Sequence, residues 1–353
     1  MGAVLVVNAG STSLKLRLVG ADESVETVEA LDAVERSRVD AVGHRVVHGG
    51  QSLREPVVVD DSVLAEIVAL ESLAPLHNAP AIAGIEAARR AVPGVPHVAV
   101  FDTAFHATMA PEASTYALPE TWREAWGIRR YGFHGLSVAW CAERAPAVLG
   151  VSPLGLRLVV CHLGGGCSVT AVKNGRSVDT TMGFSPLEGP PMTTRSGSVD
   201  PAALVYVQRE HGLSLDELER ALNEESGLKG LSGLSGDVRE LEAAAGSDEG
   251  ARLALAVYVH RVAGAVSTMA ASLGGIDALV FTAGVGEHSA GVRASVCERL
   301  GFLGVELDEA LNEHGGSDED VATAASPVRV LVIAAREELV VARATRELLA
   351  FVS

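Results

Sequence analysis

Two glycine-rich turns, each lying between two apolar segments, have the residue types that hold a phosphate. Residues 8–13 read Asn-Ala-Gly-Ser-Thr-Ser, and residues 164–166 are three consecutive glycines. Glycine has no side chain, so the backbone N–H groups of such a turn can approach an anion closely. The same residues are typical of an ordinary tight hairpin, and the glycines alone leave both interpretations open. The first turn is not a Walker A loop, because the alternating residues 14–18 predict a strand after it rather than a helix.

Charged residues lie in or directly after two other apolar segments. Arg45 belongs to the β-branched segment 39–50, and a guanidinium pairs well with a carboxylate or a phosphate. Asp102 follows the predicted strand 96–101. Ligands bind at the carboxyl ends of strands in open α/β sheets, which favours a functional Asp102, although an aspartate there could also cap the next segment.

Histidine and cysteine spacing predicts no metal centre. His44 and His48 are four residues apart, which would suggest a metal pair on a helix, but on the expected strand they are only two positions on one face. The four cysteines show no CxxC spacing, so we expect buried free thiols at Cys141, Cys161, Cys167 and Cys297.

The predicted elements alternate between strands and helices. We expect strands at 3–7, 14–18, 39–48, 96–101, 158–163, 167–170, 276–281 and 328–333, with a turn at 172–175. We expect helices near 60–70, 82–91, 138–149, 201–211 and 249–273, after the capping box of Ser214 and Glu217, after Ser289 and at the C-terminus. Pro146 is expected to break the last turn of the third helix. Segments 76–80, 111–136, 184–198 and 227–237 are predicted loops, and the Gly-x-Gly of 282–287 is suited to packing against a flat nucleoside.

Length and composition indicate an α/β protein of two domains. The chain has 353 residues, 48% hydrophobic and only 4% aromatic, so the core is built mainly from Ala, Val and Leu, as in buried parallel sheets. The net charge of −17 argues against nucleic acid and an anionic membrane as partners, but not against a small anion bound by local arginines. Because His260 and Arg261 interrupt the most apolar long segment, 253–273, and no charged leader precedes an apolar stretch, we expect a cytoplasmic protein.

Six motifs in chain order resemble those of the acetate kinase family, the short-chain carboxylate kinases of the actin-like superfamily that includes sugar kinases and Hsp70. They are residues 8–15, 43–50, 101–106, 131–135, 193–195 and 281–284. The resemblance implies an α/β fold of two actin-like (ribonuclease H-like) domains with an interdomain cleft. The first domain would span 1–152 and the second 153–337, with the helix 338–353 packing back on the first.

The resemblance also implies a chemistry and its small-molecule partners. The family transfers the γ-phosphoryl group of ATP to acetate, reversibly and in line, giving acetyl phosphate and ADP. Mg²⁺ is the expected metal, with Mn²⁺ as an alternative, and a homodimer is the expected assembly. A loose phosphoryl transition state needs positive charge and positioning more than covalent chemistry.

Each site role is carried over from the family to a matching residue. Arg45 and Arg195 would hold the carboxylate and the transferring phosphoryl group, His134 would donate a hydrogen bond to that group, and Asp102 and Glu337 would position the metal, with Asn8 beside them. The acyl pocket would consist of Val47, Leu76, Phe133 and Pro186. The nucleotide and its phosphates would contact Asn8, Ser11, Ser13, Lys15, His162, Gly164, Gly165, Gly166, Asp237, Arg239, Gly284 and His288. His77 matches a position that the family uses, although it could equally hold local structure.

The chain departs from the family pattern at four places. Gly165, His288 and Arg336 each stand where asparagine is usual, and the segment before Gly43 is much shorter than usual. The catalytic arginines and His134 are retained, which favours an active kinase. Three alternatives stay open: a propionate or butyrate kinase, a non-catalytic nucleotide-binding regulator on the same fold, and use of a phosphate donor other than ATP.

Overall fold

The computed structural model describes residues 2–9, 14–71 and 75–352, with the side chains of 75–77 and 352 left undescribed. The chain divides into two compact units. The first unit contains Met1–Ala107, Phe133–Trp140 and Arg336–Ser353, and the second contains Thr108–Gly132 and Cys141–Ala335.

The first unit is built on a mixed six-stranded sheet with the order β3-β2-β1-β4-β6-β5. Its three central strands, β1 (Ala3–Ala9), β4 (Val39–Val46) and β6 (His97–Phe101), run parallel. The strands β2 (Leu14–Val19), β3 (Val25–Val28) and β5 (Val57–Val58) pair antiparallel at the edges. The parallel strands are nearly continuous apolar runs because helices cover both of their faces.

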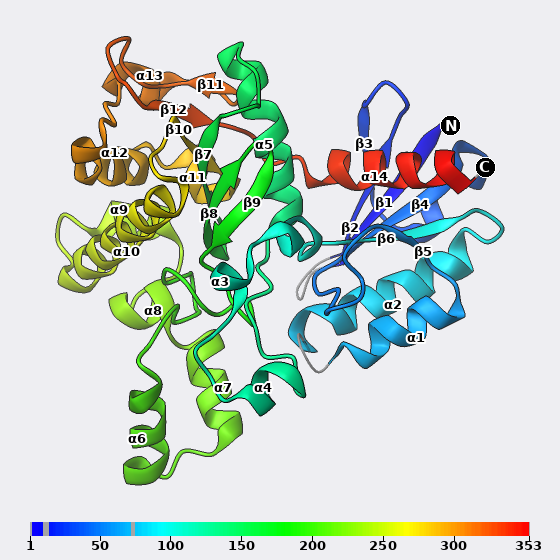
Figure 1. The fold of residues 1–353 in the computed structure, drawn as a ribbon, viewed down its shortest axis with the longest axis horizontal. Helices are drawn as coiled ribbons and strands as arrows, with labels where there is room; N and C mark the ends of the chain where they lie inside the picture. The colour runs from blue at the N-terminus through cyan, green and yellow to red at the C-terminus, as the bar shows by residue number, and fades with distance from the viewer. Residues whose placement is uncertain (1, 10–13, 72–74, 353) are drawn as a thin grey trace. The chain divides into compact units, whose positions relative to one another are not determined.

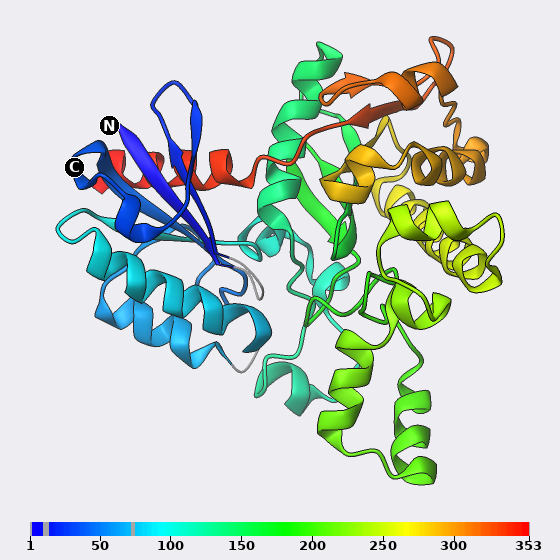
Figure 2. The same cartoon turned by 180° about the vertical axis from the view of Figure 1, so that it is seen from behind.

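Helices α2 (Pro75–Ala91) and α14 (Glu337–Val352) pack on opposite faces of this sheet (Figures 1 and 2). A Cβ added at Gly43 of β4 would lie 2.7 Å from the side chains of Val341 and Thr345, so glycine lets α14 approach the sheet closely. Helix α1 (Asp61–Ala69) packs beside α2, and Asp60 caps it by accepting a hydrogen bond from the backbone N–H of Val63.

The second unit repeats the plan with a sheet ordered β11-β12-β10-β7-β8-β9. The strands β7 (Arg157–Leu163), β10 (Ala278–Thr282) and β12 (Arg329–Val332) are parallel, whereas β8 (Cys167–Lys173), β9 (Arg176–Thr180) and β11 (Glu319–Asp320) are antiparallel to their neighbours. The long helix α10 (Glu249–Leu273) packs on β7, β8 and β9. It is apolar and long enough to cross a membrane, but its buried face lies on this sheet, as in the core helix of a globular domain.

The other helices mostly lie where the sequence predicts them. Asp200 caps α6 (Pro201–His211), and the predicted capping box of Ser214 and Glu217 opens α7 (Leu215–Glu224). All four cysteines are buried free thiols, as expected. The remaining helices are α3 (Pro111–Ser114), α4 (Glu120–Glu124), α5 (Gly135–Leu149), α6 (Pro201–His211), α7 (Leu215–Glu224), α8 (Gly227–Ser232), α9 (Val238–Ala244), α11 (Ala283–His288), α12 (Ala290–Arg299) and α13 (Glu309–His314).

Three local predictions are wrong. The predicted loop 76–80 belongs to α2, because burial of Ala81 and Ile85 in the core outweighs the hydrogen bond that Pro80 cannot donate. Helix α5 begins at Gly135 and continues through Pro146 to Leu149 without a break. The segments predicted as loops at 111–136 and 227–237 contain the short helices α3, α4 and α8.

Buried neutral histidines make the stability of the first unit depend on pH. Burial lowers the pKa of His44 to about 3, with His97 adding to the effect, and burial lowers the pKa of His106 to about 4. In the unfolded chain these histidines bind protons below about pH 6.5, so their contribution to stability is present above that pH and is lost as pH falls toward the folded pKa.

We expect His106→Gln to weaken this pH dependence. Between pH 7 and pH 5, the wild-type free energy of unfolding should fall by about 2 kcal/mol more than that of the variant. Urea unfolding at both pH values measures the difference, and the exposed His211→Gln serves as the control. An identical change in the wild type and His106→Gln would show that this histidine is not neutral in the folded protein.

Candidate active site

A charged cluster forms where the parallel strands of the first sheet end. Asn8 of β1 lies opposite Arg45 of β4 in the parallel register, so both side chains leave the same face of the sheet. Asp102 directly follows β6, and Glu337 is the first residue of α14, which covers that face. The tertiary structure thus brings four predicted site residues together.

Arg45 is the centre of this cluster. Its Nε lies 3.2 Å from Oδ1 of Asp102, its Nη2 contacts Oδ2 of the same carboxylate, and Glu337 Oε2 lies 3.5 Å from Nε. Arg45 Nη1 also donates to Oδ1 of Asn8 at 3.1 Å. The guanidinium is therefore held in one orientation by a bidentate ion pair and a side-chain amide.

Burial sets the electrostatics of these groups. Burial raises the pKa of Asp102 to about 6, against the lowering effect of Arg45, and the carboxylate of Glu337 adds to the rise. Burial alone would lower the pKa of Arg45, but Asp102 and Glu337 raise it above its ordinary value. Arg45 therefore stays charged, and burial makes the ionised form of Asp102 more costly than it would be in water.

The oxygen atoms of this cluster suit a hard divalent cation. Asp102 and Glu337 offer carboxylates, and Asn8 offers an amide oxygen, the donor types that Mg²⁺ prefers while it keeps several waters. No group of three His, Cys, Asp or Glu side chains that could hold a metal occurs in the described part of the chain. The His44 and His48 pair is structural instead: His44 Nε2 lies 2.9 Å from Nδ1 of His97, and His48 Nδ1 accepts from the backbone of Gly50.

His134 lies directly before α5 in a left-handed backbone conformation, with φ 59°. The following Gly135 cannot carry a side chain, because its Cβ would lie 2.0 Å from the carbonyl oxygen of Asp102. That oxygen also accepts the backbone N–H of Gly135 at 3.1 Å, so the start of α5 is fixed against the residue that pairs with Arg45. In the same unit Val47 and Phe133 are buried, and the Phe133 carbonyl lies 2.9 Å from Nε2 of His106.

Two residues that support the site were missed by the sequence analysis. The buried Asn78 accepts from the backbone N–H of His48 and donates to its carbonyl oxygen, both at 3.1 Å. Thr103 Oγ1 accepts from the backbone N–H of Gly49 at 3.1 Å. Asn78 lies in the segment 76–80 that was predicted as a loop, so no sequence signal pointed to its role, whereas Thr103 lies next to Asp102 in a segment already singled out.

A cavity of about 510 Å³ lies in the second unit, at the carboxyl ends of β7 and β10. Six of the predicted nucleotide residues line it: Gly164, Gly165, Asp237, Arg239, Gly284 and His288. The three glycines at 164–166 close an antiparallel hairpin between β7 and β8, with Gly164 N–H donating to the carbonyl of Gly166 at 2.8 Å. The turn is therefore a hairpin whose glycines also form a cavity wall.

The cavity walls are tied to one another by polar contacts. Thr193 Oγ1 donates to the Gly165 carbonyl at 3.1 Å. Asp237 caps α9 through the backbone N–H of Arg239 and forms an ion pair with its side chain at 2.5 Å. The ring of His162, a residue of β7, lies beside the glycine turn, since a Cβ at Gly164 would be 3.6 Å from its Nε2.

Arg195 lies in the long loop after β9. Its Nη1 donates to the carbonyl of Pro186 at 2.6 Å, and burial lowers the pKa of its guanidinium. Glycine is required at 227, with φ 62°, because a Cβ there would lie 2.2 Å from the Met192 carbonyl and 2.8 Å from that of Arg195. The backbone around Arg195 is thus closely packed.

The other predicted site residues are distributed differently. Val47 and Phe133 belong to the first unit, whereas Pro186 belongs to the second. Lys15 lies on β2 with an exposed side chain, opposite Asn8 in the register. Ser11, Ser13 and the side chains of Leu76 and His77 lie outside the described residues.

Two sheets of matching topology, a guanidinium held by carboxylates and a glycine-lined cavity define a phosphotransferase of the actin-like class. The chain belongs to the acetokinase family, whose model matches residues 24–343. Members of this family transfer a phosphoryl group to a carboxyl group, and the chain is an enzyme of this kind.

Named relatives and solved structures agree with this assignment. The acetate kinase of Deinococcus deserti is 54% identical over 318 residues, covering 89% of this chain and 80% of the relative, and that of Nostoc punctiforme is 52% identical over 308 residues, covering 87% and 76%. The crystal structure of Porphyromonas gingivalis acetate kinase has a TM-score of 0.91 at 35% identity, covering 99% of this chain and all of that one. A propionate kinase from Francisella tularensis has the same TM-score and identity, covering 98% and 100%.

Proposed function

We propose that this chain is an acetate kinase that transfers the γ-phosphoryl group of ATP to acetate, reversibly and in line. The observation that carries the proposal is the orientation of Arg45 by Asp102, Glu337 and Asn8 at the strand ends of the first sheet. A planar guanidinium held in this way can pair with the two oxygens of a carboxylate or a phosphoryl group. The relatives named acetate kinase support acetate as the acceptor.

The roles of the charged side chains follow from phosphoryl-transfer chemistry. We assign Arg45 and Arg195 to the carboxylate and the transferring phosphoryl group, and His134 to a hydrogen bond with that group. A divalent metal, for which we propose Mg²⁺ with Mn²⁺ as an alternative, supplies charge neutralisation on the nucleotide phosphates when bound. Asp102, Glu337 and Asn8 carry the oxygen atoms that would hold it, directly or through water.

We assign the nucleotide to the cavity of the second unit. Its volume of about 510 Å³ lies in the range of small-molecule sites, and its glycine wall offers backbone donors for phosphates. His162, Gly166 and the N-terminal residues Ser11, Ser13 and Lys15 complete the proposed phosphate contacts. Because Gly165 has no side chain, backbone N–H groups and His162 would carry the binding at this turn.

Propionate is the second candidate acceptor, since a structure described as a propionate kinase matches this chain as well as an acetate kinase does. We assign the acyl group to Val47, Leu76, Phe133 and Pro186, four residues with apolar side chains. One methylene in such a pocket changes discrimination by about 1–3 kcal/mol. We therefore propose a preference for acetate with measurable use of propionate.

The cellular setting belongs to the same proposal. We propose a cytoplasmic homodimer. The expected domain bounds 1–152 and 153–337 differ from the two compact units, because residues 108–132 and 141–152 group with the second unit, whereas 338–353 group with the first as expected. Members of this family transfer a phosphoryl group to a carboxyl group, which favours an enzyme over a non-catalytic nucleotide-binding regulator.

A hydroxamate assay on the purified protein tests the proposal. Acetate, propionate and butyrate are each combined with ATP, GTP and pyrophosphate in the presence of Mg²⁺ or Mn²⁺. We expect the highest turnover with acetate and ATP. Acyl phosphate formed only from another pair would change the substrate assignment, and no acyl phosphate from any pair would refute the kinase function.

Gly165→Asn should tighten nucleotide binding without disturbing the fold. No atom lies within 4 Å of a Cβ built at Gly165, and its φ is not positive, so an asparagine fits without strain. Its amide would add one hydrogen-bond donor to the phosphate turn, so we expect the KM for ATP to fall about 3-fold to 10-fold. Gly246→Asn, at an equally open position away from the cavity, is the control, and an unchanged KM in Gly165→Asn would show that position 165 is neutral.

A further inference from the structure

The loop of residues 181–189, here called the Pro186 loop, connects the second sheet to Arg195. The carbonyl of Pro186 accepts the hydrogen bond from Nη1 of Arg195 at 2.6 Å. Any displacement of this carbonyl therefore moves an acceptor that orients the guanidinium. The contacts that hold the Pro186 loop in place therefore also hold the guanidinium of Arg195.

The Pro186 loop borders a cavity of about 440 Å³, separate from the glycine-lined one. Phe184, Ser185, Leu187 and Glu188 contribute to its wall, together with residues of the segment 116–128. Close packing cannot hold the loop on the side that faces this space. On that side, the position of the loop depends on directional polar contacts.

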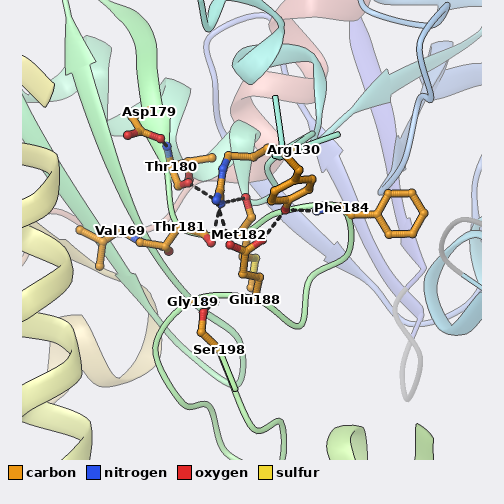
Figure 3. Close-up of polar contacts among 11 residues, drawn as sticks. Arg130, Val169, Asp179, Thr180, Thr181, Met182, Phe184, Glu188, Gly189 and Ser198 are labelled. Carbon is orange, nitrogen blue, oxygen red and sulfur yellow. Dashed lines mark hydrogen bonds and ion pairs between the residues drawn. The ribbon is translucent and has the colours of Figure 1, made fainter. Parts of the chain in front are cut away.

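Arg130 makes more of these contacts than any other single side chain, beside backbone bonds such as those from the N–H groups of Tyr131 and Gly132 to the Gly183 carbonyl. Its Nη1 donates to three successive carbonyls, at the last residue of β9 and the first two of the loop, and its Nη2 donates to Oε1 of Glu188 at 2.8 Å (Figure 3). The acceptors of Nη1 are Thr180 at 2.9 Å, Thr181 at 2.9 Å and Met182 at 3.2 Å. The side chain is only 17% exposed, so these charge-assisted bonds are poorly replaced by water. One guanidinium joins the beginning of the loop to its end.

Tyr116 and Glu188 complete the arrangement. The Tyr116 hydroxyl donates to Glu188 Oε2 and accepts from the backbone N–H of Phe184 at 3.0 Å. A Cβ at Gly183 would lie 1.7 Å from Glu188 Oε2 and 2.0 Å from the Tyr116 hydroxyl, so the pair packs directly on the loop backbone. The loop is thus bonded before and after Pro186.

We infer that Arg130 is a positioning residue for the phosphotransfer reaction: with Tyr116 and Glu188 it fixes the Pro186 loop and, through the Pro186 carbonyl, the orientation of Arg195. Arg130 itself needs no contact with substrate. The inference rests on the proposed function in assigning Arg195 to the reacting groups. The contacts that hold the Pro186 loop and Arg195 all lie within the second unit.

Arg130→Met keeps the apolar stem and removes every donor. A misplacement of about 1 Å in a reacting group can cost about 100-fold in rate, so we expect kcat/KM for acetate to fall about 10-fold to 100-fold. The KM for ATP should stay within about 2-fold, because neither Arg130 nor the Pro186 loop lines the glycine-lined cavity. Arg130→Lys keeps the charge and some donors and should recover part of the loss.

Arg329→Met is the matched control. Arg329 also joins an acidic side chain to backbone carbonyls in the second unit, through Asp320 at 2.6 Å and Thr323 at 2.8 Å, and it has no contact with the Pro186 loop. Both variants should lose similar thermal stability. Only Arg130→Met should lower kcat/KM for acetate, whereas equal kinetic losses in both variants would overturn the inference.

Two further measurements separate this inference from the proposed function. In an Arg195→Ala background, Arg130→Met should add less than about 2-fold to the kinetic loss, because the residue through which it acts is gone. Hydrogen exchange needs no activity: Arg130→Met should speed exchange of the amides in 183–189 and leave β7 and α10 unchanged. Full additivity of the two substitutions or unchanged exchange in the loop would overturn the positioning role, whereas an inactive wild type with the expected exchange would refute only the proposed function.

Discussion

Arg195→Ala is expected to lower kcat by about 1,000-fold while the protein stays folded. Guanidinium groups that stabilise a transferring phosphoryl group contribute rate factors of about 10³–10⁵ in kinases and GTPases. The substitution removes a hydrogen bond to the Pro186 carbonyl but keeps the backbone bond from Met192 N–H to the Arg195 carbonyl. Steady-state kinetics with acetate and ATP measure the first effect, and thermal unfolding measures the second.

The exposed Arg176→Ala, in the same unit, is the control for a lost surface charge. It should change neither kcat nor the melting temperature. Near-normal turnover in Arg195→Ala would refute the role given to this arginine. A large fall in melting temperature would instead mean that the side chain mainly holds its loop.

Arg45→Met is expected to abolish turnover and to lower the free energy of unfolding by about 3–5 kcal/mol, the usual cost of breaking a buried ion pair by removing one partner. Asp102, with a side chain 1% exposed, would then face Glu337 without a counter-charge. Loss of the arginine raises the pKa of Asp102 further. The folded variant therefore keeps a proton on Asp102 at pH values well above about 4, where the same carboxyl in the unfolded chain has lost it. The destabilisation should therefore be larger at pH 8 than at pH 5.5.

Adding Asp102→Asn to Arg45→Met tests the electrostatic explanation. The neutral amide removes the uncompensated charge, so the double variant should recover stability at pH 8 without recovering turnover. Urea unfolding at the two pH values measures the stability. If Arg45→Met loses the same free energy at both pH values and Asp102→Asn restores nothing, the loss comes from packing and not from charge.

Local sequence was sufficient wherever short-range physics decides the structure. The apolar segments became strands because each of them, such as 158–163, can be buried on both faces under covering helices. Asp200 and Ser214 begin helices because their side-chain oxygens satisfy backbone N–H groups that a helix leaves unpaired. The type of each such element could be predicted from a few neighbouring residues.

Local sequence failed where tertiary packing opposed it. The segment 76–80 was predicted as a loop and Pro146 as a helix break, yet Pro80 and Pro146 both lie inside helices whose apolar faces pack against neighbouring elements. Asn78, predicted in a loop, instead holds the backbone of His48 from α2. Propensity differences of a few kcal/mol are smaller than the burial of a long helix.

The sequence by itself determined which residues could do the chemistry, because charge, glycine and their order along the chain are local properties. Only the tertiary structure decided which of them meet. Asn8 and Glu337 are 329 positions apart, and they contact one another because strand register and the docking of α14 bring both to Arg45. The ion pair of Arg130 with Glu188 is equally non-local, since the two residues are 58 positions apart and their contact depends on the path of the Pro186 loop. Such contacts depend on the register and packing of whole elements, which no short stretch of sequence specifies.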